Sequence, residues 1–264
     1  MSKKTMMGLV CVALMLASGS VLHATIWNGA TSSDWADGSN WNTGTKPAIG
    51  DDVFLGAQAN NPVVSTVEEL RSLNMGENVT ASGAGPTLTI TNGGSLLFGP
   101  RGLNVYEATI NVEKGGSFTA AWEFFLGGPL AGFDTRTTIN ISGDFTQNPN
   151  AHQVRLGNAS AAGFGFATVN LEAGTFYVND LIFNKGAWTG NEDSHIFIRN
   201  GEVRLPDSFE GIYDSDWKND EIQAVAGLSL VKRVEGGFLY VTAPEPATLS
   251  ILALCGLPLL RRRR

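Results

Sequence analysis

Short segments of alternating apolar and polar residues recur along most of this chain, and each segment breaks at glycine. Five copies can be aligned, at residues 88–96, 110–118, 139–145, 169–176 and 196–203. In each copy the alternation is typical of a half-buried strand, and an apolar residue follows the glycine two positions later. The repeated unit is therefore a strand, a tight glycine turn and a second strand.

The apolar residue that follows each glycine turn recurs at intervals of 22, 27, 31 and 27 residues. These residues are Leu96, Phe118, Phe145, Phe176 and Val203. Repeats of this size are typical of the coils of a parallel β-helix, in which loops take up the variation in length. We therefore predict an all-β solenoid with Phe118, Phe145 and Phe176 stacked in its interior. The alternative, an antiparallel β-sandwich, explains the alternation but not the recurring glycine turn.

A second apolar strand in several coils also ends in glycine or asparagine, at residues 124–128, 154–158 and 181–184. This strand predicts a second face for each coil. Because the coils of a solenoid stack on one another, equivalent asparagine, serine and threonine side chains can form ladders. No helix of useful length is predicted in this region, and residues 67–73 are expected to form a short turn or strand.

The ends of a solenoid expose strand edges and an apolar core, so both ends require caps. The N-terminal candidate is a segment with Trp27, Trp35 and Trp41, and residues 25–56 are similar to segments that begin many repetitive exported β-proteins. The other interpretation is a sugar-binding platform, because indole faces suit carbohydrate rings. The accompanying hydroxyl acceptors would be Asp34, Asp37 and Asp51. At the C-terminal end, the residues predicted to close the core are Ile212, Tyr213, Trp217 and those at 218–221, 228–231 and 238–241.

The first 24 residues have the layout of a secretory signal peptide. Lys3 and Lys4 precede an apolar stretch at residues 6–16, and small residues are frequent in the stretch that follows. Cleavage is expected after Ala24, with cleavage after Ser20 as the alternative. The functional region would then be residues 25–243.

The last 21 residues, 244–264, form a three-part pattern. Pro244, Glu245 and Pro246 make a rigid turn, and 14 largely apolar residues follow at 247–260. As a helix, that run would cover roughly 21 Å, which is short of the roughly 30 Å hydrocarbon core of a bilayer. Four arginines then end the chain: Arg261, Arg262, Arg263 and Arg264. The positive-inside rule would keep them in the cytoplasm as a stop-transfer signal, so the run is expected to be a short membrane anchor.

This order of Pro-Glu-Pro, short apolar helix and basic cluster resembles the PEP-CTERM sorting signal of exported bacterial proteins. The resemblance is limited to residues 244–264. It implies export across an inner membrane, recognition of Pro244, Glu245 and Pro246 by an exosortase, and delivery to the cell surface or to an exopolysaccharide matrix. It implies nothing about the activity of the region before it.

The composition of residues 25–243 excludes several classes of function. The two cysteines, Cys11 and Cys255, lie outside this region, so it holds neither a disulfide framework nor a thiolate metal site. Of 18 basic and 25 acidic residues, six basic and one acidic residue belong to the two end segments. The remaining formal charge of −12 disfavours nucleic acid and anionic lipid as partners.

Few residues suggest catalysis. No nucleophile elbow, metalloprotease or phosphate-binding motif occurs, and the histidines of residues 25–243 are His152 and His195. β-Helix lyases and hydrolases need carboxylates and basic groups on successive coils, for which the candidates by spacing are Glu113, Arg155, Glu172 and Arg199. Oxygen ligands for calcium could come from Asp214, Asp216, Asn219 and Asp220. Their spacing departs from an EF-hand loop, so a solvated acidic turn is preferred, and no metal or cofactor is predicted.

Two hypotheses of function follow. The first is a noncatalytic, membrane-anchored and then surface or matrix protein with a structural or adhesive role, which is not an enzyme. The second is a carbohydrate-binding or polysaccharide-degrading β-helix. The expected partners are an exosortase, the inner membrane through the C-terminal helix and, in either hypothesis, exopolysaccharide.

Overall fold

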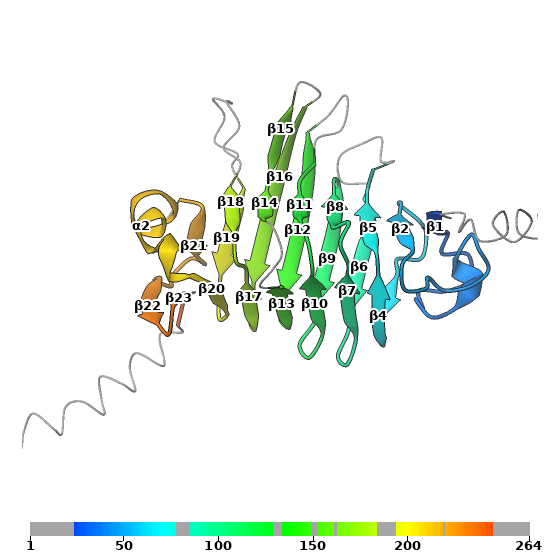
Figure 1. The fold of residues 1–264 in the computed structure, drawn as a ribbon, viewed down its shortest axis with the longest axis horizontal. Coiled ribbons are helices and arrows are strands. Elements are labelled where there is room, and N and C mark those ends of the chain that lie inside the picture. The colour runs from blue at the N-terminus through cyan, green and yellow to red at the C-terminus, as the bar shows by residue number, and fades with distance from the viewer. Residues whose placement is uncertain are drawn as a thin grey trace, which may run out of the picture.

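The protein is a stack of short strands that wind into a three-sided β-solenoid, seen in a computed structural model (Figure 1). The structure describes residues 24–77, 85–128, 134–148, 153–160, 163–183, 194–218 and 220–244. Neighbouring strands along the stack are parallel in all three sheets, except at the C-terminal end and at one excursion. The predicted parallel β-helix is therefore confirmed, and the β-sandwich alternative is wrong.

Each sheet collects one strand from each successive coil. Sheet A has the order β1 (Ala24–Trp27), β2 (Asp52–Leu55), β5 (Ser72–Met75), β8 (Leu103–Val105), β11 (Phe124–Leu126), β14 (Val154–Leu156) and β18 (Leu181–Phe183). Sheet B has the order β3 (Val63–Val64), β6 (Thr87–Ile90), β9 (Ala108–Val112), β12 (Thr135–Ile141), β16 (Gly163–Leu171), β19 (His195–Ile198) and β21 (Ile222–Ala224). Sheet C has the order β4 (Val67–Leu70), β7 (Ser95–Phe98), β10 (Ser117–Ala120), β13 (Asp144–Gln147), β17 (Thr175–Tyr177), β20 (Glu202–Pro206), β23 (Phe238–Thr242) and β22 (Val231–Glu235).

Three faces surround the core, whereas the sequence predicted two. The strand before each glycine turn lies in sheet B and the strand after it lies in sheet C, so the glycine turn is a corner between two faces. Gly174 shows why this corner needs glycine. Its φ of +71° is unfavourable for other residues, and an added Cβ would lie 1.8 Å from the carbonyl oxygen of Gly143 in the coil below.

The predicted interior stack is present in the predicted register. Leu96, Phe118, Phe145, Phe176 and Val203 pair in succession across sheet C, and all five are fully buried. The ring centroids of Phe118 and Phe145 are 5.6 Å apart, and those of Phe145 and Phe176 are 4.8 Å apart. One column of aromatic side chains therefore helps to hold successive coils in register.

The variation in repeat length falls mainly at the corner between sheets A and B. Only two residues, 106 and 107, separate β8 from β9, whereas residues 184–194 separate β18 from β19. At the same corner, β15 (Asn158–Ser160) pairs antiparallel with the start of β16. Loop insertions here leave the stacked strands unchanged, as expected of a solenoid.

A short helical segment closes the C-terminal end of the solenoid, which the sequence did not predict. It consists of η2 (Asp207–Phe209), α2 (Glu210–Ile212) and η3 (Tyr213–Trp217). Tyr213 is fully buried and Trp217 is 7% exposed, so both close the core as predicted. The prediction is wrong for Ile212 and Val231, which are 42% and 45% exposed. Residues 67–73, for which a turn or strand was expected, contribute β4 and the start of β5.

The two predicted address segments lie almost wholly outside the described residues. β1 begins at Ala24 and β23 ends at Thr242, so the described fold occupies nearly the same residues as the predicted functional region. The signal peptide, the anchor at 247–260, the four terminal arginines, Glu245 and Pro246 therefore stay predictions. Within the part of the chain that the structure describes, no helix is both long and apolar enough to cross a membrane.

Candidate functional site

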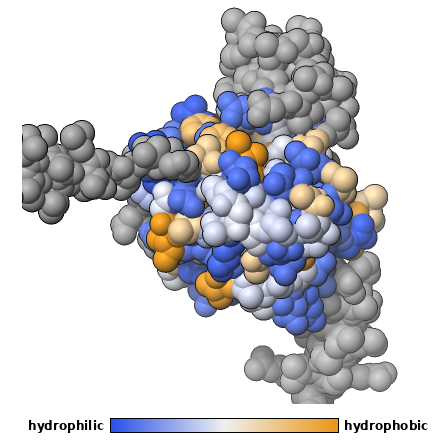
Figure 2. Space-filling view, turned by 90° about the vertical axis from the view of Figure 1, so that its right-hand side faces the viewer, coloured by the Kyte–Doolittle hydropathy of each residue, from blue (hydrophilic) through white to orange (hydrophobic). Residues whose placement is uncertain are grey.

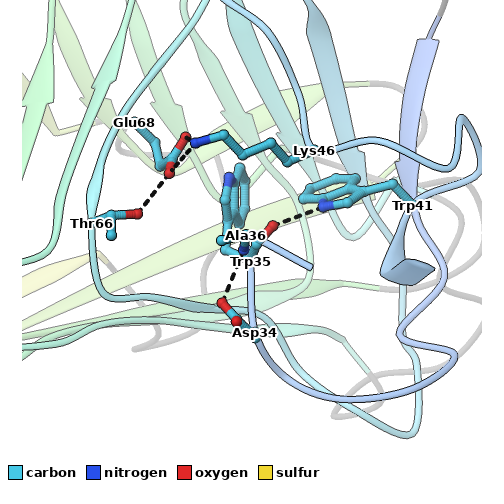
Figure 3. Close-up of polar contacts among 7 residues, drawn as sticks. All are labelled: Asp34, Trp35, Ala36, Trp41, Lys46, Thr66 and Glu68. Atoms are coloured by element: carbon cyan, nitrogen blue, oxygen red, sulfur yellow. Dashed lines mark hydrogen bonds and ion pairs between the residues drawn. The ribbon is translucent and has the colours of Figure 1, made fainter. Parts of the chain in front are cut away.

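The three tryptophans at the N-terminal end form a closed cluster rather than a sugar platform. Trp27, Trp35 and Trp41 are 0%, 1% and 2% exposed. The Trp41 ring meets the other two edge-on, with centroid distances of 4.9 Å to Trp27 and 4.7 Å to Trp35. Figure 3 shows Trp35 and Trp41 of this cluster. Because the ring faces are covered, they cannot stack on a carbohydrate. The cluster is the predicted cap, and this end of the molecule presents a mostly hydrophilic surface (Figure 2).

The aspartates near this cluster serve the cap's own backbone. Asp37 accepts hydrogen bonds from the Ser39 amide at 3.0 Å and the Ser39 hydroxyl at 2.6 Å, and these bonds lower the pKa of Asp37. Asp34 accepts from the Ala36 amide at 3.0 Å (Figure 3), and Asp51 accepts from the Ala48 amide at 2.9 Å. All three carboxylates therefore fix turns, and the proposed role as sugar acceptors has no support in this geometry.

Glu68 is a buried carboxylate that the sequence analysis overlooked. It pairs in register with the interior residue Leu96 and is only 5% exposed. Its oxygens accept from the Lys46 ammonium at 2.9 and 3.1 Å and from the Thr66 hydroxyl at 2.7 Å (Figure 3). The available signal was a charged residue at an inward position of the alternating strand β4. Its charge is matched by Lys46, so it ties the cap loop to the first coil.

The four candidate catalytic side chains do not converge on one site. Glu172 and Arg199 form an ion pair at 2.6 Å at the corner between sheets B and C. Glu113 occupies the equivalent corner position two coils away, which places it roughly 10 Å along the stack. Arg155 lies on the outer side of sheet A, where its guanidinium is 5.4 Å from the Phe125 ring centroid. Only Glu172 and Arg199 are therefore brought into direct contact.

The acidic turn near residue 214 is held by a lysine. Lys232 donates to Glu210 at 2.8 Å and also to Asp214, and these two bonds raise the pKa of Lys232. Asn219 and His152 lie outside the described residues. No group of three or more acidic, histidine or cysteine side chains suited to a metal ion occurs among the residues that the structure describes.

The outer side of sheet B carries two regular polar rows. The inner alternating residues are buried, and the outward ones form ladders across successive coils. Asn170 donates its amide to Asn140 at 2.8 Å, and Asn140 donates to Asn111 at the same distance. The predicted asparagine ladder is therefore confirmed. His195 and Phe197, whose rings stack at 5.5 Å, occupy the next coil.

The outer side of sheet C ends in a cluster of arginine and aromatic side chains. The Arg204 guanidinium carbon lies 3.8 Å from the Phe238 ring centroid, 5.0 Å from that of Tyr177 and 5.5 Å from that of Tyr240. Arg233 lies 4.4 Å from the Tyr240 centroid. These contacts attach the terminal hairpin of β22 and β23 to the last coil.

The chain matches no protein-family model, no curated protein and no solved structure. Its function therefore has to be inferred from its own residues and their arrangement.

Proposed function

We propose that this chain is an exported, noncatalytic surface or matrix protein with a structural or adhesive role. It would be held at the inner membrane by residues 247–260 and then sorted by an exosortase that recognises Pro244, Glu245 and Pro246. Arg261, Arg262, Arg263 and Arg264 would act as the cytoplasmic stop-transfer signal.

The observation that carries this proposal is the position of Pro244. The tryptophan cap and β1 lie at one end of the solenoid, and β23, which Pro244 follows closely, lies at the other end (Figure 1). Sheet C, with eight strands at about 4.8 Å each, extends roughly 34 Å between these ends. A tether that begins at Pro244 would therefore present the capped end outward, as suits a protein that projects from a membrane.

The candidate catalytic side chains already contact other side chains of the protein, which supports a noncatalytic role. Glu172 is neutralised by Arg199, and Arg155 packs on Phe125 on another sheet. General acid and base catalysis requires two groups positioned around one bond. A polysaccharide-degrading enzyme remains the second hypothesis, and it predicts that purified protein releases reducing ends or unsaturated products. Products that disappear in Glu172→Gln would overturn the noncatalytic proposal.

Cell fractionation in a bacterial host that has an exosortase tests the tether. We expect the full chain in the membrane fraction, and a chain truncated after Ala243 in the soluble exported fraction. A matched control replaces Pro244 and Pro246 with alanine and keeps the apolar run and arginines, so it should stay membrane-bound without being released to the surface. A full chain as soluble as the truncated one would contradict the anchor, and normal release of the alanine control would contradict recognition of the Pro-Glu-Pro turn.

A further inference from the structure

We propose that the outer side of sheet B binds a linear, uncharged polysaccharide that runs along the solenoid axis. This inference deepens the adhesive role proposed above by assigning it a surface and a class of ligand. The binding surface, called the polar face below, consists of two rows. The first row is Thr87, Thr109, Thr138 and Thr168, and the second is Thr89, Asn111, Asn140 and Asn170.

The polar face is periodic in two directions. Members of a row are direct register partners in neighbouring coils, so they repeat at about 4.8 Å along the axis. The two rows are separated by two residues of one strand, or roughly 6.6 Å. All eight side chains are partly exposed. A surface that repeats the same groups at equal steps is suited to a ligand that also repeats, and each sugar of an extended glycan spans a distance similar to one coil.

Hydrogen-bonding capacity remains on both rows. Each side-chain hydrogen bond of the asparagine ladder uses one N–H and one oxygen lone pair. The second N–H and the second lone pair of each inner asparagine have no partner within the described residues. The hydroxyls of the threonine row, from Thr87 to Thr168, make no hydrogen bond within the described part of the chain. Sugar hydroxyls both donate and accept, so they match amide and hydroxyl groups of this kind.

The absence of charge in the two rows selects an uncharged polymer. The region around them carries a formal charge of −12, which would repel polymers rich in uronate or sulfate. The outward rows of the other two sheets include charged residues, such as Arg155 on sheet A and Arg204 on sheet C. On sheet B, the outward residue Arg136 lies beside the threonine row but outside the two rows, and its guanidinium packs 5.5 Å from the Phe166 ring centroid. A neutral polymer would meet no unpaired charge on the polar face, and its binding would depend little on salt.

An aromatic pair ends the polar face. His195 follows Thr168 and Phe197 follows Asn170 in the two rows, and their rings lie 5.5 Å apart with an interplanar angle of 21°. Flat rings beside hydrogen-bonding side chains suit the apolar face of a sugar ring. The aromatic pair favours a carbohydrate as the ligand of the polar face. The alternative ligand, ordered water as in ice, would need only polar groups.

The test compares two matched double variants of the full-length exported chain. Thr138→Val with Thr168→Val removes two hydroxyls from the polar face and keeps the β-branched shape. Thr119→Val with Thr146→Val removes two outward hydroxyls from adjacent coils of sheet C and serves as the control. A third variant, Phe197→Ala, removes part of the aromatic end. Circular dichroism and melting temperature show that each variant is folded.

Binding is measured by affinity electrophoresis and calorimetry with mixed-linkage β-glucan, galactomannan and dextran, and with alginate as an anionic comparison. We expect at least one neutral polymer to bind, with little change between low and high salt. The sheet B double variant and Phe197→Ala should each weaken binding at least fivefold, and the sheet C control should weaken it less than twofold.

Several outcomes would overturn the proposal. These are no binding to any neutral polymer, equal loss in the two double variants, binding to alginate alone, or shaping of ice crystals without glycan binding. None of these outcomes would alter the fractionation result, so a failed polar face and a failed membrane tether are distinguishable. A tethered protein without glycan binding would retain the structural part of the proposed function.

Discussion

The two ends of the solenoid solve the same problem by different means. At the N-terminal end, three indoles fill the interior above the first coil and are almost fully buried. At the C-terminal end, a short helical segment and a hairpin cover the last coil, and Ile212, Val231 and Val234 remain more than 40% exposed. One end is closed mainly by insertion of side chains, and the other mainly by added backbone.

The strand edges at the two ends are also covered in different ways. The N-terminal cap bridges Trp27 to Trp41 and Asp34 to Val63, and the Trp35 amide donates to the Val63 carbonyl at 3.1 Å. At the other end, β23 pairs antiparallel with β20, and the outermost strand β22 carries Lys232, Arg233 and Glu235. Charged residues on an exposed edge disfavour pairing with another chain. Because the side chains of the N-terminal cap are more completely buried, we expect substitutions there to lower the free energy of unfolding more than equivalent ones at the C-terminal cap.

Trp41→Ala should have the largest effect. Trp41 contacts both other indoles and donates from Nε1 to the Trp35 carbonyl at 2.9 Å. Removal of a buried tryptophan costs about 3–5 kcal/mol in the free energy of unfolding. The matched substitution at the C-terminal cap is Trp217→Ala. Trp217 is 7% exposed, and its ring contacts those of Phe183 and Phe209. In urea denaturation, Trp217→Ala should lose less free energy of unfolding than Trp41→Ala. Equal losses would contradict the proposed difference between the caps.

Lys46→Ala tests the polar part of the N-terminal cap. It would leave the Glu68 carboxylate buried without its cation, which costs about 2–3 kcal/mol because Lys46 is half-exposed and water can partly compensate. Glu68→Leu together with Lys46→Ala should recover most of this stability, since it continues the apolar row that begins with Leu96. Chemical denaturation of the single and double variants measures the difference. A double variant less stable than Lys46→Ala would show that the carboxylate has a role beyond its ion pair.

The repeated coils could be predicted from the sequence because each one repeats the same local physics. Alternation fixed which side chains face inward, and the glycine turn set the register, so Phe118, Phe145 and Phe176 were placed correctly in one column. The third face was missed because the corner from sheet B to sheet C is only a few residues long. The sequence shows the same alternation of apolar and polar residues whether a strand bends at glycine within one face or turns there into a new face.

The ends and the polar contacts could not be predicted in the same way. Glu68 lies inward because Lys46, 22 residues earlier, reaches it, and such pairing depends on the fold of the cap loop. The segment 207–217 forms turns of three different helix types, none long enough to give a helical period. Among the candidate site residues, Glu172 and Arg199 were brought together but Arg155 was not, because spacing alone does not say on which of three faces a residue lies.

High pH should weaken the C-terminal cap selectively. Burial, with a smaller contribution from Asp214, raises the pKa of Tyr213 to about 12, and its hydroxyl has no hydrogen-bond partner among the residues that the structure describes. The folded pKa lies above the unfolded value of about 10, so the stabilising contribution is complete below pH 10 and is lost as the pH rises toward 12. We expect the loss to be about 1–2 kcal/mol.

Tyr213→Phe isolates this effect. The variant should be at least as stable as the parent at pH 7, because it removes a buried hydroxyl without a partner. Between pH 10 and 12 its free energy of unfolding should fall less steeply than that of the parent. Parallel curves for the two proteins over that range, measured by urea denaturation, would contradict a buried neutral phenol at this end.

Arg204→Met should have the smallest effect and tests whether the terminal hairpin is held from outside. Methionine keeps an unbranched apolar stem but loses the cation that stacks on Phe238, Tyr177 and Tyr240, so we expect a loss of about 1 kcal/mol in urea denaturation. Arg155→Met is the control, since Arg155 stacks on one ring and lies on β14, which is paired on both sides in sheet A. A loss at Arg204 no larger than at Arg155 would mean that backbone pairing between β20 and β23 alone retains the hairpin, which would sharpen the contrast with the indole-filled end.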